Sequence, residues 1–252
     1  MTAPPTPAPA DPALLEDLTL TCWPALMTVH RDGWLIRLSG GHTGRSNSVN
    51  VIAPGREPVA DKIAFAESVY ATHGLPALFR VTPLCPPDMA PTLDRAGYRP
   101  FDTSSVQVLD RLPDGAPDSA VTVERGPTDA FSDAYARIRS VPAHEVEPMR
   151  AILEAIPMPT FYVSLAEGGR IVATAMTVVD RGWAGLFKVA VDPGSRGRGL
   201  GRRVTLAALS AAAGLGAGRC WLQVASDNAP ACALYAGMGF REVYTYTYFR
   251  RR

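Results

Sequence analysis

The stretch VDPGSRGRGLGRR, from Val191 to Arg203, places four glycines and four arginines in thirteen positions. An apolar, strand-like run precedes it and a helix-like run follows it. Gly197, Gly199 and Gly201 have no Cβ atom, so the main chain there can turn tightly and bring its N–H groups against a phosphate. A helix that begins near Gly201 points the positive end of its dipole at the same place. The stretch therefore predicts a strand, an anion-binding loop and a helix that together hold a pyrophosphate.

Two common nucleotide-binding patterns do not fit this loop. A P-loop requires a lysine after its second glycine, and counting from Gly194 to Gly199 puts Leu200 at that position. A dinucleotide-binding GxGxxG pattern fails too, because Arg202 or Val204 replaces its last glycine in the two possible registers. The loop is therefore not expected to hydrolyse nucleotides or to bind a dinucleotide.

A third pattern does fit. Arg196, Gly199 and Gly201, between a strand and a helix, resemble the acyl-CoA loop of the GCN5-related N-acetyltransferase (GNAT) superfamily. The order of expected strands and helices over residues 121–252 resembles the same superfamily. The resemblance implies acetyl-CoA as a co-substrate, bound by the loop and by the main chain of the preceding strand. The cofactor-binding residues that it implies are Val189, Ala190, Val191, Arg196, Gly197, Arg198, Gly199, Leu200, Gly201, Arg202 and Asn228.

The segment SDNAPACALYAGMGF, residues 226–240, resembles a second GNAT segment in which Asn228 and Tyr235 occupy matching positions. The resemblance implies that Tyr235 is catalytic and protonates the leaving CoA thiolate. A phenol with a pKa of about 10 can do so when the thiol pKa is about 8.5. Two structural alternatives stay open: Asn228 can be a helix N-cap ahead of Pro230, and Tyr235 can simply pack on a helix face.

The base that deprotonates the acceptor amine is not evident from the sequence. Many GNAT members place a glutamate near the diverging strand, where this chain has only Lys188. His144, Glu145 and Glu147 lie between two expected helices on the side where the resemblance puts the acceptor. These three are candidates, and the sequence does not choose among them.

The chain of 252 residues is long enough for one large domain or two small ones. We predict a disordered Pro/Ala tail at 1–15, a first lobe at 16–110, a linker at 111–120 and a catalytic second lobe at 121–252. The two lobes carry similar segments in the same order: VNVIAPG, LFRV and TLDRAGYR in the first, and VAVDPG, WLQV and LYAGMGFR in the second. The sequence thus predicts an α/β fold, with mixed α+β sheet, of two tandem GNAT-like lobes. Chance similarity of generic α/β sequence is the alternative.

The first lobe lacks the loop that the second lobe has. In APGREPVADK, Gly55 is followed by Arg56 and Glu57 and by no further glycine, so close approach to a phosphate is not supported. We therefore expect this lobe not to bind the cofactor. The polar segment from Gly40 to Asn50, with Trp23 and Trp34, could line an acceptor pocket between the lobes. An ordinary surface loop is the alternative.

Composition limits the remaining possibilities. The hydrophobic fraction is 47% and the net charge is only +1, which fits a globular protein that binds anions locally rather than over its whole surface. The four cysteines form no CxxC pair, so they read as thiols in a reducing compartment rather than as disulfides or a metal site. The N-terminus does not read as a secretion signal, and no apolar run approaches the ~20 residues of a membrane span. We expect a cytoplasmic protein with no metal, nucleic-acid or membrane partner.

These observations predict an acetyl-CoA-dependent N-acetyltransferase that acts by direct attack of a small-molecule amine on the thioester. The alternative is a non-catalytic acyl-CoA-binding protein with a regulatory or assembly role. Either a monomer or a homodimer is compatible with two lobes in one chain.

Overall fold

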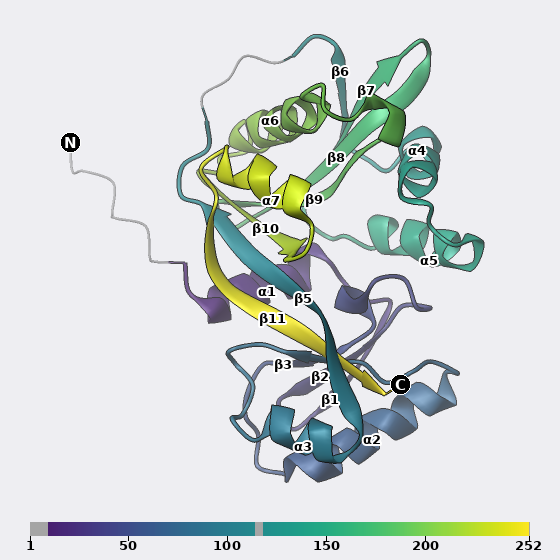
Figure 1. Ribbon diagram of the computed structural model, residues 1–252, viewed down its shortest axis with the longest axis vertical. Coiled ribbons are helices and arrows are strands. Elements are labelled where there is room, and N and C mark those ends of the chain that lie inside the picture. Colours follow the sequence, from purple (N-terminus) through teal and green to yellow (C-terminus); the bar gives the residue numbers. More distant parts are fainter. Residues whose placement is uncertain (1–9, 114–117, 252) are drawn as a thin grey trace, which may run out of the picture.

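The computed structural model describes residues 10–113 and 118–251, and one order of elements occurs in it twice (Figure 1). Each copy runs strand, strand, strand, helix, strand, short helix and long last strand. The first copy consists of β1 (Met27–Arg31), β2 (Trp34–Leu38), β3 (Val49–Val51), α2 (Val59–Thr72), β4 (Phe79–Val81), α3 (Met89–Arg95) and β5 (Tyr98–Leu109). The second consists of β7 (Thr160–Glu167), β8 (Arg170–Asp180), β9 (Trp183–Val191), α6 (Leu200–Ala213), β10 (Arg219–Ala225), α7 (Ala229–Ala236) and β11 (Arg241–Arg251). The predicted α/β fold of two similar units is confirmed.

Other elements surround these copies. Helix α1 (Pro12–Cys22) precedes the first copy, and β6 (Val121–Glu124), α4 (Asp129–Arg139) and α5 (Ala143–Glu154) lie between the two. Short 3-10 turns occur after β2, at η1 (Gly44–Ser46), and after β9, at η2 (Pro193–Ser195). Figure 1 shows α5 next to the loops of the first lobe and α4 beyond it, beside the sheet of the second lobe.

The two copies exchange their last strands within one continuous mixed sheet. The strand order is β1-β2-β3-β4-β11-β5-β10-β9-β8-β7-β6. Strand β5 of the first copy therefore pairs with β10 of the second, and β11 of the second pairs with β4 of the first. The long strands β5 and β11 also pair with each other and run side by side down the middle of the molecule (Figure 1). The lobes are thus continuous in sequence but interlocked in space.

Strands β9 and β10 separate partway along their length. They pair in parallel from Arg219 and Trp183 as far as Leu222 and Leu186, and beyond this point β9 stays with β8 alone. The β8–β9 register shifts next to Lys188, whose φ of 52° is unusual for a residue other than glycine. The divergence leaves main-chain groups at the end of β9 without a strand neighbour on one side, in the place predicted from the sequence.

The N-terminal boundary differs from the prediction, because residues 12–15 belong to α1 and not to a tail. Asp11 caps this helix by accepting the N–H of Leu14 at 2.9 Å, and Pro12 occupies the first turn, where its missing N–H has no cost. Leu15 and Leu18 are fully buried against the central strands. The burial of these leucines, which the Pro/Ala-rich composition around them did not reveal, stabilises the helix. The rest of the predicted tail, residues 1–9, and residues 114–117 of the predicted linker lie outside the described residues.

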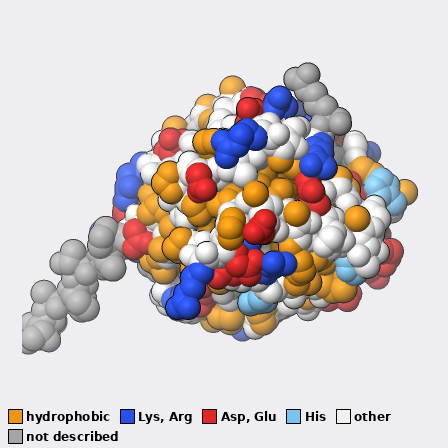
Figure 2. Space-filling view, turned by 90° about the horizontal axis from the view of Figure 1, so that it is seen from below, with side chains coloured by type: hydrophobic (Ala, Val, Ile, Leu, Met, Phe, Trp, Pro, Cys, Tyr) orange, Lys and Arg blue, Asp and Glu red, His pale blue; other side chains and the backbone are white. Residues whose placement is uncertain are grey.

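The surface carries charges of both signs. Figure 2, seen from the end that holds the first lobe, shows acidic and basic side chains interspersed among hydrophobic ones rather than a continuous basic stripe in the described part of that face. None of the described helices is both long and apolar enough to cross a membrane. The four cysteines are free thiols, and burial raises the pKa of Cys22 to about 12.

Candidate active site

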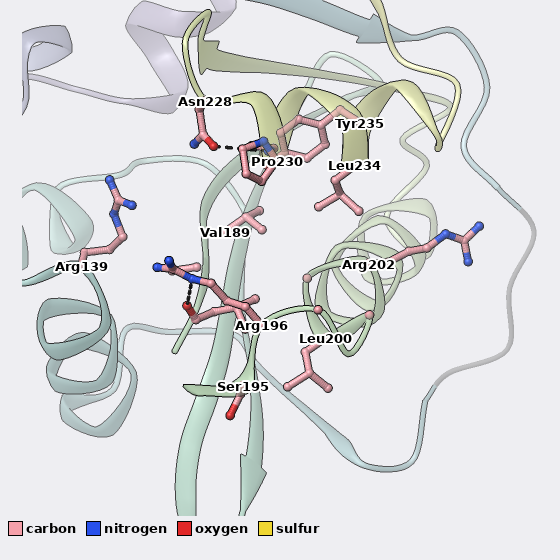
Figure 3. Close-up of a pocket in the computed structure, with 16 residues that line it drawn as sticks. Arg139, Val189, Ser195, Arg196, Leu200, Arg202, Asn228, Pro230, Leu234 and Tyr235 are labelled. Carbon is pink, nitrogen blue, oxygen red and sulfur yellow. Dashed lines mark hydrogen bonds between the residues drawn. The ribbon is translucent and has the colours of Figure 1, made fainter. Parts of the chain in front are cut away.

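The arginine and glycine loop adopts the conformation that its glycines allow. Gly197 and Gly199 both have a φ of 74°, in the left-handed region that glycine tolerates best. Gly199 is the N-cap of α6, so the first N–H groups of that helix, beginning at Leu200, have no intrahelical acceptor. The strand β9, the loop and the helix α6 therefore follow one another as predicted, and the helix N-terminus opens on a cavity (Figure 3).

We call this cavity, of about 550 Å³, the cofactor cavity. Its wall contains Tyr235 and every predicted cofactor-binding residue except Arg198. Residues that were not predicted to bind the cofactor also line it, from η2, α4 and α7. These additional residues are Arg139, Ser195, Pro230, Ala231 and Leu234. Figure 3 shows α6 and α7 on one side of the cavity and Arg139, from α4, on the other.

The arginines of the loop differ in what they contact. Arg198 is directed to Glu167, to which it donates two hydrogen bonds of 2.8 Å, and it does not line the cofactor cavity. Arg203 similarly donates to Asp118 at 2.7 Å. Arg196 and Arg202 do line the cavity, and the Nε of Arg196 donates to the carbonyl of Val191 at 3.3 Å. Arg198 and Arg203 are thus held by carboxylates. Arg196 and Arg202 line the cavity, although the Arg202 side chain extends from α6 away from Val189 and Arg196 (Figure 3).

Asn228 is both a helix cap and a residue of the cavity wall. Its Oδ1 accepts the N–H of Ala231 at 3.3 Å, so it is the N-cap of α7 (Figure 3). Asn228 also lines the cofactor cavity. The capping bond fixes the start of the short helix that carries Tyr235.

A second cavity, of about 390 Å³, lies between the lobes, and we call it the acceptor cavity. Thr43, Gly44 and Arg45 of the first lobe line it, as predicted for the segment from Gly40 to Asn50. The second lobe and the two central strands supply the rest of the wall. These residues are Asp102, Ser104, Tyr135, Arg139, Leu186, Phe187, Lys188, Val189, Gln223, Val224, Ala225, Asn228, Ala231, Tyr235, Tyr246 and Tyr248.

The two tryptophans proposed for this wall lie elsewhere. Trp23 is buried, stacks on Phe187 with ring centroids 5.4 Å apart, and donates its Nε1–H to the Thr43 hydroxyl at 3.2 Å. It therefore supports the cavity wall from behind. Trp34 belongs to the core of the first lobe, because β2 is buried on both faces.

Tyr235 lies where the two cavities meet. It lines both of them, together with Arg139, Val189, Asn228 and Ala231. Its ring packs edge-on against Phe240, and Tyr235 is only 7% exposed. Tyr235 therefore also packs in the core, which is the structural alternative that the sequence left open. Burial raises the pKa of the Tyr235 phenol, which keeps the hydroxyl protonated at neutral pH.

The three candidate bases differ in their exposure and in their contacts. His144 and Glu147 are exposed at the start of α5. Glu145 instead accepts a hydrogen bond from the Nδ1 of His42 at 3.0 Å, and the Nε2 of His42 lies 3.2 Å from the Nζ of Lys188. Sequence reasoning did not identify His42 or Lys188 as site residues. The signal for Lys188 was its position as the one charged residue in the apolar run GLFKVAV.

In the first lobe, the corresponding loop before α2 binds a carboxylate of the protein itself. The carboxylate of Asp32 accepts the N–H groups of Arg56 and Glu57 at 2.6 and 2.7 Å, and the Nζ of Lys62 lies 3.3 Å away. A Cβ atom at Gly55 would lie only 2.2 Å from the Asp32 carbonyl oxygen, so this loop also needs a glycine. In the first lobe the N–H groups of this loop are thus already bonded to an internal carboxylate.

The diverging strands, the glycine- and arginine-rich loop before α6 and the two adjoining cavities are those of an acetyltransferase of the GNAT type. A sequence model of the family described as "Probable histone acetyltransferase Rv0428c C-terminal" matches residues 11–249. The chain belongs to this family.

Known proteins agree with this class over nearly the whole chain. An uncharacterized N-acetyltransferase of Bacillus subtilis, YobR, is 26% identical over 246 residues, which cover 94% of this chain and 98% of that protein. The solved structure of a GCN5-related N-acetyltransferase from Kribbella flavida matches with a TM-score of 0.69 and 18% identity over 95% of each chain. A tandem GNAT protein from the clavulanic acid biosynthesis pathway matches with a TM-score of 0.63 and 18% identity, covering 97% of this chain and 89% of that one. These structures establish the fold, including two GNAT units in one chain.

Proposed function

We propose that the second lobe transfers the acetyl group of acetyl-CoA to the amine of a small molecule bound in the acceptor cavity. The observation that carries this proposal is the position of Tyr235, which lines the cofactor cavity and the acceptor cavity at once. A thioester that reaches this junction from one side meets an amine that reaches it from the other. Such placement of two reactants accounts for a large part of enzymatic rate enhancement.

The residues of the cofactor cavity fit acetyl-CoA. Gly197 and Gly199 allow the main chain to approach a pyrophosphate, and the N-terminus of α6 adds the favourable end of its dipole. Arg196 and Arg202 supply positive charge for further phosphate oxygens. The unpaired end of β9, from Val189 to Val191, offers main-chain groups to the amide groups of the pantetheine arm, as a neighbouring strand would.

The reaction proceeds by direct attack and needs no covalent enzyme intermediate. The electron pair of the neutral amine forms the new C–N bond, and the electron pair of the C–S bond leaves on sulfur. Tyr235 then donates its proton to the thiolate, because its hydroxyl stays protonated in this buried position.

The charge of the acceptor cavity favours an amine that also carries a carboxylate. Arg45 and Arg139 line this cavity, one from the first lobe and one from α4. Asp102 is the one acidic side chain among the described lining residues, and it is exposed. An anionic group on the acceptor would pair with the guanidinium groups and orient the amine toward Tyr235.

A thiol-release screen tests the proposal. Acetyl-CoA would be incubated with the full chain and with glycine, aspartate, putrescine or an alanyl peptide, each amino acid being compared with its methyl ester. We expect thiol release above the amine-free control, and a rate for the preferred amino acid about tenfold above that of its ester. Binding of acetyl-CoA in calorimetry with no release for any amine would instead support the non-catalytic acyl-CoA-binding role.

A further inference from the structure

A line of three polar side chains leads from the acceptor cavity to the surface. Lys188, on β9, lines the cavity, and its Nζ lies 3.2 Å from the Nε2 of His42. The Nδ1 of His42 lies 3.0 Å from a carboxylate oxygen of Glu145, on α5. Lys188 and His42 are buried, whereas the Glu145 side chain is 26% exposed. The chain of contacts thus begins at the reaction site and ends in solvent.

The hydrogen-bonding capacity of each group fixes the direction of these contacts. An ionised carboxylate can only accept, so we assign the proton of neutral His42 to Nδ1, which donates to Glu145. Nε2 then carries a lone pair and accepts an N–H from Lys188. When Lys188 is a neutral amine, its own lone pair is left for the acceptor cavity.

The surroundings of Lys188 favour the neutral amine. Its side chain is buried against the rings of Tyr135 and Trp23, with Nζ 4.1 and 4.9 Å from their centroids. Such ring faces attract an ammonium, but they also keep water away from it, and the loss of hydration disfavours the charged form. Burial and the positive charges of Arg45 and Arg139 lower the pKa of Lys188 well below its ordinary value, and Glu145, beyond His42, only partly opposes them. Burial, and the charge of Lys188 whenever that lysine is protonated, lower the pKa of His42 to about 4. The other titratable groups on the cavity wall are Asp102, Tyr235, Tyr246 and Tyr248.

Both ends of the Lys188–His42 contact are held rigidly. Lys188 sits at the irregular point of β9, with a positive φ, and its carbonyl accepts the Thr174 hydroxyl at 3.0 Å. Asn47 ties the loop of His42 together: its Oδ1 accepts the N–H groups of Ser39 and Gly41, and its Nδ2 donates to the His42 carbonyl at 2.7 Å. The first lobe therefore contributes a positioned imidazole to a site whose cofactor cavity belongs to the second lobe.

We propose that Lys188 is the base that accepts the proton of the acceptor ammonium, and that His42 and Glu145 pass this proton to solvent. The proposal rests on the acetyl transfer proposed above and supplies the base that the sequence did not reveal. The ammonium gives one proton to the Nζ lone pair of Lys188, and the amine then attacks the thioester. After the attack the nitrogen loses a second proton. This proton goes to Tyr235 and replaces the one that Tyr235 gives to the CoA sulfur. Lys188 returns to its neutral form by handing its proton to Nε2 of His42, which releases its Nδ1 proton toward Glu145.

The chain has only two lysines, Lys62 and Lys188, so their ionisation can be followed directly. With 13C-labelled lysine, two side-chain Cε signals are expected, and Lys62→Arg assigns them. We expect the Lys188 signal of the wild type to titrate well below the ~10.4 of an unperturbed lysine and to move to still lower pH in Glu145→Gln, which loses a negative charge. A Lys188 signal that stays ionised to pH ~10 would overturn the proposal, whether or not an acceptor amine is known.

Activity variants test the relay in a second way, with the amine of the screen that gives the fastest thiol release. Lys188→Met and Lys188→Arg should both lower kcat about a hundredfold and remove the rising limb of the pH–rate profile, with acetyl-CoA affinity in calorimetry retained. Arginine keeps the positive charge and the donors but cannot act as a base at neutral pH, so activity in Lys188→Arg would point to a structural cation and overturn the proposal. His42→Gln and Glu145→Gln should reduce kcat, whereas the exposed neighbours His144→Gln and Glu147→Gln should not. Acetylation of Lys188 by acetyl-CoA alone, detected by mass spectrometry, would make it a nucleophile and would likewise refute the relay.

Discussion

The guanidinium of Arg80 donates hydrogen bonds to both carboxylate oxygens of Glu16, and both side chains are buried. Arg80 lies on β4 of the first lobe, and Glu16 lies on α1. The hydroxyl of Tyr244, from the exchanged strand β11, donates to the same carboxylate. One buried carboxylate thus joins the N-terminal helix, the first lobe and the last strand of the chain.

Substitution of Glu16 by alanine should therefore destabilise the whole interlocked sheet. The change leaves the Arg80 charge buried without its partner, which costs about 3–5 kcal/mol. Asp17→Ala is the matched control, because the neighbouring Asp17 pairs with Arg181 at the surface and such pairs contribute about 0–1 kcal/mol. Urea unfolding measures both values. Equal losses in the two variants would mean that the buried pair does not carry the expected energy.

A Cβ atom at Gly199 should weaken acetyl-CoA binding more than it weakens folding. Alanine at this positive φ costs about 1 kcal/mol, and the structure leaves open space around the new methyl group on the side of the cofactor cavity. Gly216→Ala provides the control, since Gly216 has a φ of 84° and open space as well but lies beyond the end of α6, away from the cavity. We expect similar unfolding free energies for the two variants and, in calorimetry, at least about tenfold weaker acetyl-CoA binding in Gly199→Ala alone. Unchanged affinity in Gly199→Ala would argue against the pyrophosphate site.

Tyr235→Phe should slow the chemical step while it leaves acetyl-CoA binding nearly unchanged. Removal of the phenolic proton removes a general acid, which lowers kcat about a hundredfold. Tyr162→Phe is the control, because the Tyr162 hydroxyl is also buried but donates to the Leu153 carbonyl, and Tyr162 lines neither the cofactor cavity nor the acceptor cavity. Since the pKa of Tyr235 is raised, the wild-type rate should show no decline from its ionisation below pH ~10. Equal kcat values for Tyr235→Phe and the wild type would exclude the proton donation.

The predicted cofactor-binding residues, apart from Arg198, do gather around one cavity, because most of them lie in one short stretch of sequence. Gly197, Gly199 and Arg196 lie within one loop, and their spacing alone implies tight turns next to a helix N-terminus. A backbone position with positive φ strongly favours glycine, so Gly197 and Gly199 mark the place where the chain turns between β9 and α6. The repeated order of motifs could also be recognised in the sequence, because both copies have the same alternation of strands and helices.

The remaining features depend on contacts between distant segments. The exchange of β5 and β11 could not be predicted, because either strand can pair with its own copy or with the other one without any change in its hydrophobic pattern. His42 and Lys188 are 146 residues apart, and only the interlocked sheet brings them to a separation of 3.2 Å. From the sequence, Arg198 was expected to bind the cofactor. In the structure it donates hydrogen bonds to Glu167 instead, and this contact depends on the position of the hairpin between β7 and β8.

The last prediction concerns Asp32, which occupies the loop of the first lobe that corresponds to the proposed anion site of the second. The N–H of Glu57, followed by that of Arg56 and by Lys62, lowers the pKa of Asp32 in the folded protein. A carboxyl group with a lowered folded-state pKa stabilises the fold at every pH above its unfolded value of about 3.9, and this contribution is lost as the pH falls through the lower, folded value. Asp32→Asn should therefore be less stable than the wild type at pH 7, and the difference should shrink as the solution is acidified below about pH 4.

Thermal unfolding between pH 2 and 8 tests this expectation, with Asp94→Asn as the control because Asp94 forms only an exposed pair with Arg99. The internal carboxylate also leads us to expect one acetyl-CoA per chain in calorimetry, since the anion position of the first lobe is already filled. A stoichiometry of two, or a stability difference for Asp32→Asn that grows on acidification, would contradict the assignment of Asp32 as the built-in anion of the first lobe.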